Sequence, residues 1–137
     1  MSAGAHEVTE GEYESRRVEA GVPRQGYDID ESTIAQEAFL ERDAVSFTKG
    51  CFLGQELVCR IDSRGHVNRL LRRLRADAPL ARGSAVVVDG KEVGTVTTTV
   101  GAVALATIRR AVEPGSEVLV HTAAGDVGAR VEAVHAD

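Results

Sequence analysis

The sequence contains little besides aliphatic side chains with which to build a core. Tryptophan is absent, aromatic residues make up 4% of the 137 residues, and there are only two cysteines and three prolines. Two cysteines without a repeated Cys-x-x-Cys spacing exclude a disulfide-built scaffold and a zinc ribbon. We therefore expect a globular protein whose core consists mainly of valine, leucine and alanine.

Long hydrophobic runs are missing as well. No stretch approaches the roughly 20 apolar residues that span a bilayer, and the first residues, MSAGAHEVTEGEYE, are too acidic and polar for a secretory signal. The expected location is the reducing cytoplasm, with no membrane contact. The four histidines are scattered without paired spacing, so the sequence predicts no metal site.

The net charge of −5 is unevenly distributed along the chain. Residues 7–43 contain eleven acidic residues and four arginines, whereas residues 60–75 contain six arginines and one aspartate. The basic stretch 60–75 is either a contact surface for phosphate, polyglutamate or RNA, or a solvated face neutralised by acidic residues of the same chain. The second interpretation is favoured because no aromatic residues for base stacking are interleaved with the arginines.

The C-terminal half has a β pattern. Residues 66–137 contain six short runs rich in valine and threonine, separated by turn signals such as Asp89-Gly90 and Pro114-Gly115. Runs spaced by about ten residues with hairpin turns predict a six-stranded antiparallel β-barrel, so the fold class is mainly β.

The N-terminal half, residues 1–65, is expected to be helical, with too little apolar pattern to fold alone. A helix is predicted over residues 10–20, because acidic side chains crowd its start and Gly21 can end it. Thr33 and Gln36 predict a capping box for a short helix through about Arg42. With a further helix over residues 55–63, these elements predict the α-helical remnant of a larger α/β domain.

The stretch KGCFLGQE is the main candidate for chemistry. Cys51 lies just before a predicted helix start, two residues after Lys49 and between Gly50 and Gly54. A nearby cation and free backbone N–H groups at a helix start favour the thiolate. Cys51 is either a reactive or ligand-contacting thiol or a small buried hydrophobe at a tight turn, and residue chemistry alone does not separate the two.

Other candidate groups carry weaker signals. Cys59 lies inside the predicted helix and is assigned to the core. Glu19 and Asp28 flank a glycine-containing loop and are either ligand contacts or solvated carboxylates. No nucleophile elbow, HExxH or P-loop motif is present, so these 137 residues are not expected to form a self-sufficient enzyme.

The KGCFLGQE stretch resembles the Lys-Gly-Cys-[Phe/Tyr]-x-Gly-Gln-Glu signature of the YgfZ family of folate-binding, iron–sulfur-maintenance proteins. Upstream, RVEAGVPRQGYDID is similar to a run that this family shares with the glycine-cleavage T-protein, an aminomethyltransferase. DGKEVGTVTTTV and AVEPGSEVLV resemble the C-terminal β-barrel of both groups. The residues that match are Lys49, Gly50, Cys51, Phe52, Gly54, Gln55 and Glu56 in the signature, and Arg17, Glu19, Gly21, Pro23, Gly26 and Asp28 in the upstream run.

The resemblance implies a tetrahydrofolate-binding accessory protein for iron–sulfur cluster assembly or repair, which indirectly supports tRNA modification. It also implies that residues 1–65 are the C-terminal part of a folate-binding, ferredoxin-like middle domain. Cys51 would be the reactive thiol and Lys49 would favour its thiolate. The partners implied are folate and iron–sulfur enzymes or assembly proteins. The cofactor-binding residues implied by the resemblance are Tyr13, Arg17, Glu19, Gly50, Gly54, Gln55 and Glu56.

Two alternatives remain from different functional classes. The first is a folate-dependent aminomethyltransferase, but Tyr13 stands where that enzyme has a folate-holding arginine, and the enzyme lacks the cysteine matched by Cys51. The second is an interaction module in which residues 60–75 bind RNA or an acidic protein. Because the resemblance covers only the C-terminal third of the family, we expect a C-terminal fragment whose site is completed by an N-terminal domain or a separate partner chain.

Overall fold

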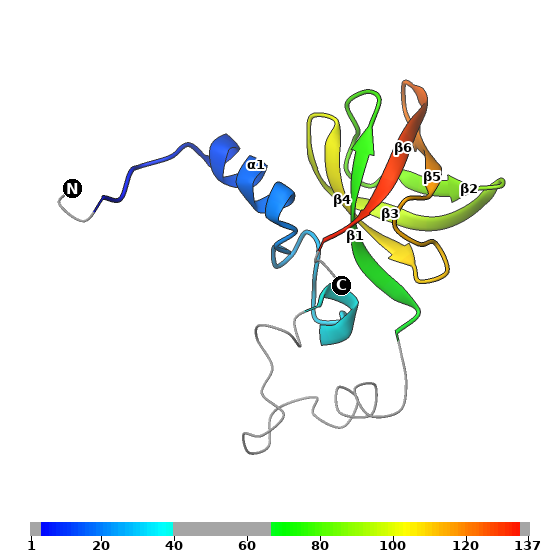
Figure 1. Cartoon of the computed structure of the whole chain (residues 1–137), viewed down its shortest axis with the longest axis horizontal. Coiled ribbons are helices and arrows are strands. Elements are labelled where there is room, and N and C mark those ends of the chain that lie inside the picture. The colour runs from blue at the N-terminus through cyan, green and yellow to red at the C-terminus, as the bar shows by residue number, and fades with distance from the viewer. Residues whose placement is uncertain (1–3, 40–66, 135–137) are drawn as a thin grey trace, which may run out of the picture.

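The computed structural model describes residues 4–39 and 67–134 (Figure 1). The described residues form one α-helix, one 3-10 helix and six β-strands. These elements are α1 (Glu10–Ala20), η1 (Ala35–Ala38), β1 (Arg69–Ala76), β2 (Ala85–Val88), β3 (Lys91–Val100), β4 (Val103–Arg109), β5 (Glu117–Thr122) and β6 (Gly125–Ala133).

The six strands close into an antiparallel barrel in the order β1-β4-β3-β2-β5-β6. Strand β1 closes the barrel because it pairs with both β4 and β6. The predicted turn Asp89-Gly90 joins β2 to β3 with both residues at positive φ, 52° and 77°, as a tight hairpin requires. The barrel interior is filled by aliphatic side chains, among them Leu74, Val86, Val96, Ile108, Val120 and Val131. The sequence-based prediction of a six-stranded barrel is confirmed.

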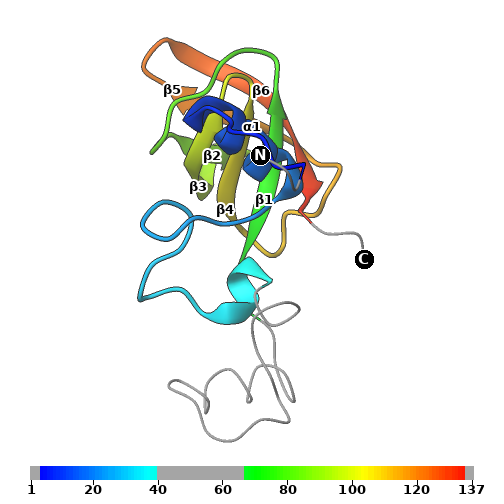
Figure 2. The same ribbon diagram turned by 90° about the vertical axis from the view of Figure 1, so that its left-hand side faces the viewer.

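A second hydrophobic cluster lies on the outside of the barrel, where the N-terminal segment packs on it. Val18 of α1 and Ala38 of η1 contact Leu71 of β1 and Leu105 of β4, and Val134 completes the cluster. In both views the C-terminal end of α1 lies against the barrel wall and η1 lies beside β1 (Figures 1 and 2). The described part of the N-terminal half therefore shares a core with the barrel.

Helix α1 forms over the predicted residues, with a defined signal at each end. The Thr9 side chain accepts a hydrogen bond from the backbone N–H of Glu12, whose carboxylate accepts from the N–H of Thr9, so both end groups are satisfied. Gly21 ends the helix at φ 72°. A Cβ atom on Gly21 would lie 2.6 Å from the Cβ of Val134, so a glycine here also lets the chain approach the barrel closely.

The segment after Asp28 differs from the prediction. The capping box expected from Thr33 and Gln36 does not form, because the Thr33 hydroxyl accepts from the backbone N–H of Asp30 at 3.0 Å, while the Glu37 carboxylate accepts from the N–H of Ile34 at 3.1 Å. This local turn competes with a longer helix, and the chain forms the 3-10 turn η1 instead.

Two other expectations for the fold fall on residues outside the described ranges. These are the helix over 55–63 and the division of the chain at residue 65, and both stay predictions. Within residues 4–39 and 67–134, no helix has both the length and the apolar character needed to cross a bilayer.

Candidate functional site

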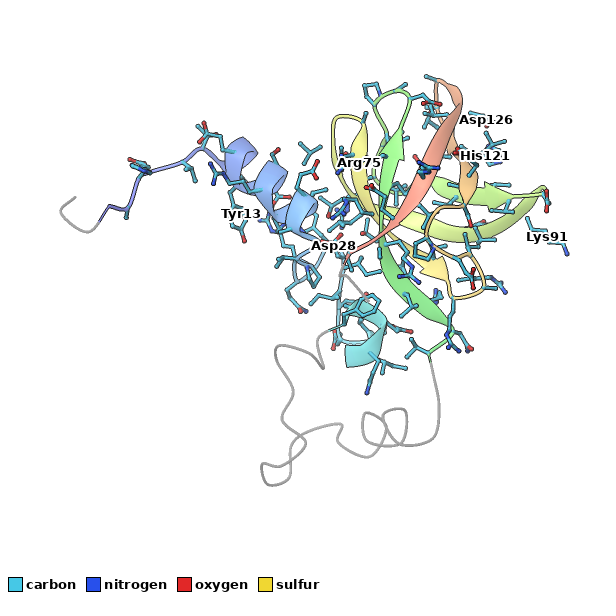
Figure 3. The ribbon with its side chains drawn as sticks, in the orientation of Figure 1. Tyr13, Asp28, Arg75, Lys91, His121 and Asp126 are labelled. Atoms are coloured by element: carbon cyan, nitrogen blue, oxygen red, sulfur yellow. The ribbon has the colours of Figure 1, made fainter. Side chains whose placement is uncertain are left out.

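In the part of the chain that the structure describes, a group of buried polar side chains lies where α1 meets the barrel (Figure 3). Its centre is the ion pair between Arg17 and Asp28, whose nearest N and O atoms are 2.7 Å apart and whose side chains are 2% and 0% exposed. Arg17 belongs to α1, and Asp28 belongs to the loop that follows it. A buried pair of this kind is tolerated only where hydrogen bonds satisfy the remaining donors and acceptors.

All five N–H donors of the Arg17 guanidinium are engaged. Nε and one Nη2 donor bind the Glu14 carboxylate at 3.0 and 2.6 Å. The Nη1 donors bind Asp28 Oδ2 at 2.7 Å and the carbonyl of Val22 at 2.8 Å, and the second Nη2 donor binds Thr98 Oγ1 at 3.2 Å. Since a guanidinium has five such donors, Arg17 has none left for a ligand in this arrangement.

Asp28 connects this cluster to strand β3. Its Oδ1 accepts from the hydroxyls of Thr97 and Thr98 at 2.5 and 2.7 Å, and its Oδ2 also accepts from the backbone N–H of Arg24 at 3.0 Å. Neighbouring residues of a regular strand point to opposite faces, but the register of β3 against β4 shifts between Val96 and Thr98. This irregularity allows two consecutive threonines to reach one carboxylate.

The pKa values follow this geometry. Burial by itself lowers the pKa of Arg17, but hydrogen bonds to the Glu14 and Asp28 carboxylates outweigh it and raise that pKa above its usual value. The hydrogen bond from Arg17 holds the pKa of Glu14 below its usual value, with a further contribution from Arg24. Both groups are therefore charged at neutral pH, and the cluster acts as an electrostatic anchor rather than as a proton donor or acceptor.

The loop around Asp28 is also held from outside by an aromatic stack. The Tyr27 ring lies under two guanidinium groups, with the Arg24 and Arg82 Cζ atoms 4.6 and 4.2 Å from its centroid. Arg82 additionally donates to the carbonyls of Gly26 and Thr97 at 3.1 and 2.9 Å. These contacts attach the loop to the end of β3 and fix the position of Asp28.

A second ionic group joins the end of α1 to β1 and β6. Glu19 binds Arg75 at 2.8 Å, and Glu132 binds both Arg75 and Arg73 at 2.7 and 3.1 Å. Arg73 also donates to the backbone carbonyl of Glu19 at 2.6 Å. The hydrogen bond from Arg75 lowers the pKa of Glu19. Two arginines of the basic stretch are thus neutralised within the chain, which favours the solvated-face interpretation for this part of it.

The residues expected to bind a cofactor do not gather around one described pocket. Tyr13 is 53% exposed on α1, Arg17 is buried in the ionic cluster, and Glu19 is paired with Arg75. The remaining predicted site residues lie outside the described residues, so their roles stay predictions; they are Lys49, Gly50, Cys51, Gly54, Gln55 and Glu56.

Sequence reasoning missed three members of the Arg17 cluster. Glu14 precedes Arg17 by three residues, a spacing that favours an ion pair on a helix and could have been recognised. Thr97 and Thr98 gave no usable signal, because a regular strand would place only one of them beside Asp28.

Comparison with known proteins supports the same architecture. Residues 69–135 match the family model described as "CAF17, C-terminal beta-barrel domain". The Arabidopsis thaliana protein named "Putative transferase At1g60990, chloroplastic" is 31% identical over 101 residues, which are 74% of this chain and 23% of that protein.

A solved structure shares the fold. The crystal structure of glycine cleavage system aminomethyltransferase T from Bartonella henselae is similar with a TM-score of 0.76 and 23% sequence identity, over 88% of this chain and 36% of that one. The chain therefore spans only about a quarter to a third of the length of these two relatives. Residues 69–135 are therefore a β-barrel domain of the CAF17 C-terminal type, and these matches support the resemblance to the YgfZ family.

Proposed function

We propose that the chain is the C-terminal part of a tetrahydrofolate-binding accessory protein that supports iron–sulfur cluster assembly or repair and, through its client enzymes, tRNA modification. The observation that supports this proposal is the KGCFLGQE signature in a chain whose barrel is of the CAF17 type. Iron–sulfur enzymes or their assembly proteins are the proposed partners. Cys51 is the proposed reactive group, and Lys49 favours its thiolate form.

The described residues contribute to this function mainly by holding the N-terminal segment in position on the barrel. With all five of its donors engaged, Arg17 is a positioning residue that holds α1 and the loop of Asp28 on the barrel. Glu19 acts in the same way through Arg75. Tetrahydrofolate supplies a pterin ring that can stack on an aromatic face, and the exposed Tyr13 of α1 is the residue proposed for such a contact.

The test is genetic complementation with the full-length protein that contains this chain. Cys51→Ser removes the proposed thiolate and is expected to abolish function, whereas Cys59→Ser, at a position assigned to the core, is expected to retain it. The pair is matched, because each substitution replaces one thiol by one hydroxyl. Equal behaviour of the two variants would refute the assignment of roles.

A folate-dependent aminomethyltransferase is the second candidate. The shared fold with the Bartonella henselae aminomethyltransferase favours it, while Tyr13 and Cys51 are departures from that enzyme's pattern. Turnover that depends on a lipoyl-bearing carrier protein, measured with the full-length protein, would support this candidate. The same assay without turnover would leave the accessory role as the better explanation of the motif.

A further inference from the structure

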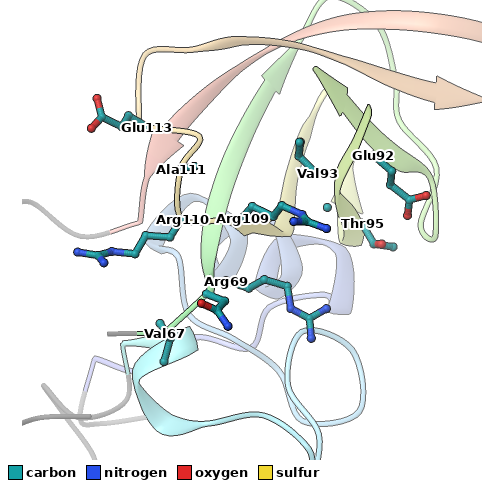
Figure 4. A pocket seen from close by; sticks show the side chains of 11 residues that line it. Val67, Arg69, Glu92, Val93, Thr95, Arg109, Arg110, Ala111 and Glu113 are labelled. Atoms are coloured by element: carbon teal, nitrogen blue, oxygen red, sulfur yellow. The ribbon is translucent and has the colours of Figure 1, made fainter. Parts of the chain in front are cut away.

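We propose that Arg69 and Arg109 bind a small phosphate- or carboxylate-bearing ligand. The two arginines lie where β1 begins and β4 ends. Both arginines line a cleft of about 930 Å³ (Figure 4), a volume in the range of small-molecule sites. The side chains that line it come from β1 and the two residues before it, from β3, from β4 and from the turn after β4, and they include Val67, Asn68, Glu92, Val93, Thr95 and Glu113.

Arg69 and Arg109 form a like-charged pair on one face of the barrel wall. They are directly opposite each other in the antiparallel register of β1 and β4, which brings the Cβ atoms of such residues to about 4.5–5.5 Å and their side chains to the same face. Both side chains extend in the same direction in the close view (Figure 4). Like charges placed directly opposite destabilise a sheet, so an anion between them would relieve a repulsion built into the fold.

Another pair of opposed arginines in the barrel is neutralised by carboxylates of the same chain. Arg75 and Arg130 are also opposite each other, in the register of β1 and β6. Arg75 is bound by Glu19 and Glu132 at 2.8 and 2.7 Å, and Arg130 has Glu117 at 3.9 Å. The chain thus supplies carboxylates to this second pair.

By contrast, no carboxylate within residues 4–39 or 67–134 lies within 4.0 Å of a guanidinium nitrogen of Arg69 or Arg109. The charge of this pair is therefore available to a ligand. A guanidinium presents a planar fork of N–H donors that matches the oxygens of phosphate and carboxylate groups.

The surroundings of the pair favour a small anion over a nucleic acid. Glu92 and Glu113 line the same cleft, so the positively charged surface is small. An RNA backbone needs an extended positively charged groove. Arg110 also lines the cleft, but its side chain points away from Arg69 and Arg109 (Figure 4). The proposed site therefore consists of Arg69 and Arg109, in a cleft that Glu92 and Glu113 also line.

A second pocket beside the cleft can hold an uncharged polar part of such a ligand. This pocket has a volume of about 240 Å³ and shares Arg69, Gly94 and Thr95 with the cleft. Threonines and carboxylates dominate its remaining lining, including Asp30, Thr33, Glu37, Thr97 and Thr107. Hydroxyl or amine groups attached to the anionic group would find hydrogen-bonding partners there.

The test is titration calorimetry of the whole chain at low ionic strength with two probes, inorganic pyrophosphate and tricarballylate. Binding of pyrophosphate alone identifies a phosphate ligand, and binding of tricarballylate alone identifies a carboxylate ligand. Arg69→Gln and Arg109→Gln are each expected to weaken binding about tenfold to a hundredfold, the effect of one lost charge-assisted hydrogen bond. Arg130→Gln, which removes an exposed arginine elsewhere on the barrel, is the matched control and should leave the affinity unchanged.

Thermal unfolding without any anion shows whether the variants fold. Arg69→Gln and Arg109→Gln should keep or raise the midpoint, because each removes one member of a like-charged pair. The proposal is overturned if neither probe binds, if both substitutions leave the affinity unchanged, or if Arg130→Gln weakens binding equally. Tighter binding of single-stranded RNA than of either probe, with the same arginine dependence, would also overturn it in favour of a nucleic-acid surface.

Discussion

Replacing Asp28 by asparagine should strongly destabilise the protein without changing the volume of the side chain. In the folded protein Asp28 accepts hydrogen bonds from the Arg17 guanidinium, from the Arg24 backbone and from two threonine hydroxyls. Asparagine removes the negative charge and presents N–H donors to groups that are themselves donors. The charge of Arg17 then stays buried with less compensation.

The magnitude follows from the environment of that charge. Removing one partner of a buried ion pair costs about 3–5 kcal/mol. Arg17 keeps its two bonds to Glu14, which places the expected loss near the lower limit, at about 3 kcal/mol. Since domains are stable by only about 5–15 kcal/mol, the variant should unfold at a clearly lower urea concentration.

Urea titration followed by far-ultraviolet circular dichroism measures the free energy of unfolding directly. Asp30→Asn is the control, because among residues 4–39 and 67–134 the Asp30 side chain bonds only to Ser32 and Thr33 of its own exposed turn. Its effect should be much smaller. Adding Arg17→Met to Asp28→Asn should cost less than the sum of the two single losses, since it removes the uncompensated charge. A loss below about 1 kcal/mol for Asp28→Asn would refute the anchoring role of the pair.

Two further predictions concern a glycine and a carboxylate. Gly94→Ala should lower the free energy of unfolding by about 1–3 kcal/mol, because its Cβ would lie 2.3 Å from the carbonyl oxygen of Thr107. Gly11→Ala, on the open side of α1, should instead raise the free energy of unfolding by about 0.5–1 kcal/mol. Equal effects of the two substitutions in urea titration would contradict this contrast. The hydrogen bond from Arg17 holds the pKa of Glu14 below its ordinary value of 4.5. The stabilising effect of Glu14 is therefore present above about pH 4.5 and is lost as pH falls through the lower folded-state pKa. The unfolding midpoint should therefore fall less below pH 4.5 in Glu14→Gln than in the unaltered protein, and an identical pH profile of the two proteins would contradict the prediction.

The sequence contained enough information to predict the barrel and α1. Alternating valines and threonines, the Asp89-Gly90 turn and the Gly21 cap act over a few residues, so each could be recognised without knowledge of the tertiary structure. The capping box predicted at Thr33 was wrong because local signals can also conflict. There a local turn around Asp30 and a helix compete within a few residues, and the pattern does not show which one forms.

The Arg17 cluster could be predicted only in part. The upstream run drew attention to Arg17, Glu19 and Asp28, yet their sequence positions could not distinguish a ligand contact from a buried ion pair. That distinction depends on partners up to 81 residues away, such as Thr98, and on the irregularity of β3 that turns Thr98 towards Asp28. Long-range pairing of this kind leaves no local pattern in the sequence.

The most direct test of the proposed function is the pH dependence of thiol alkylation at the two cysteines, measured residue by residue with mass spectrometry. If Lys49 favours the thiolate of Cys51, this thiol should react at a pH well below the ordinary cysteine pKa of about 8.5, and Lys49→Met should raise the pH that it requires. Cys59 should require a higher pH in both proteins. Equal alkylation profiles of Cys51 and Cys59, unchanged by Lys49→Met, would contradict the assignment of the reactive thiol.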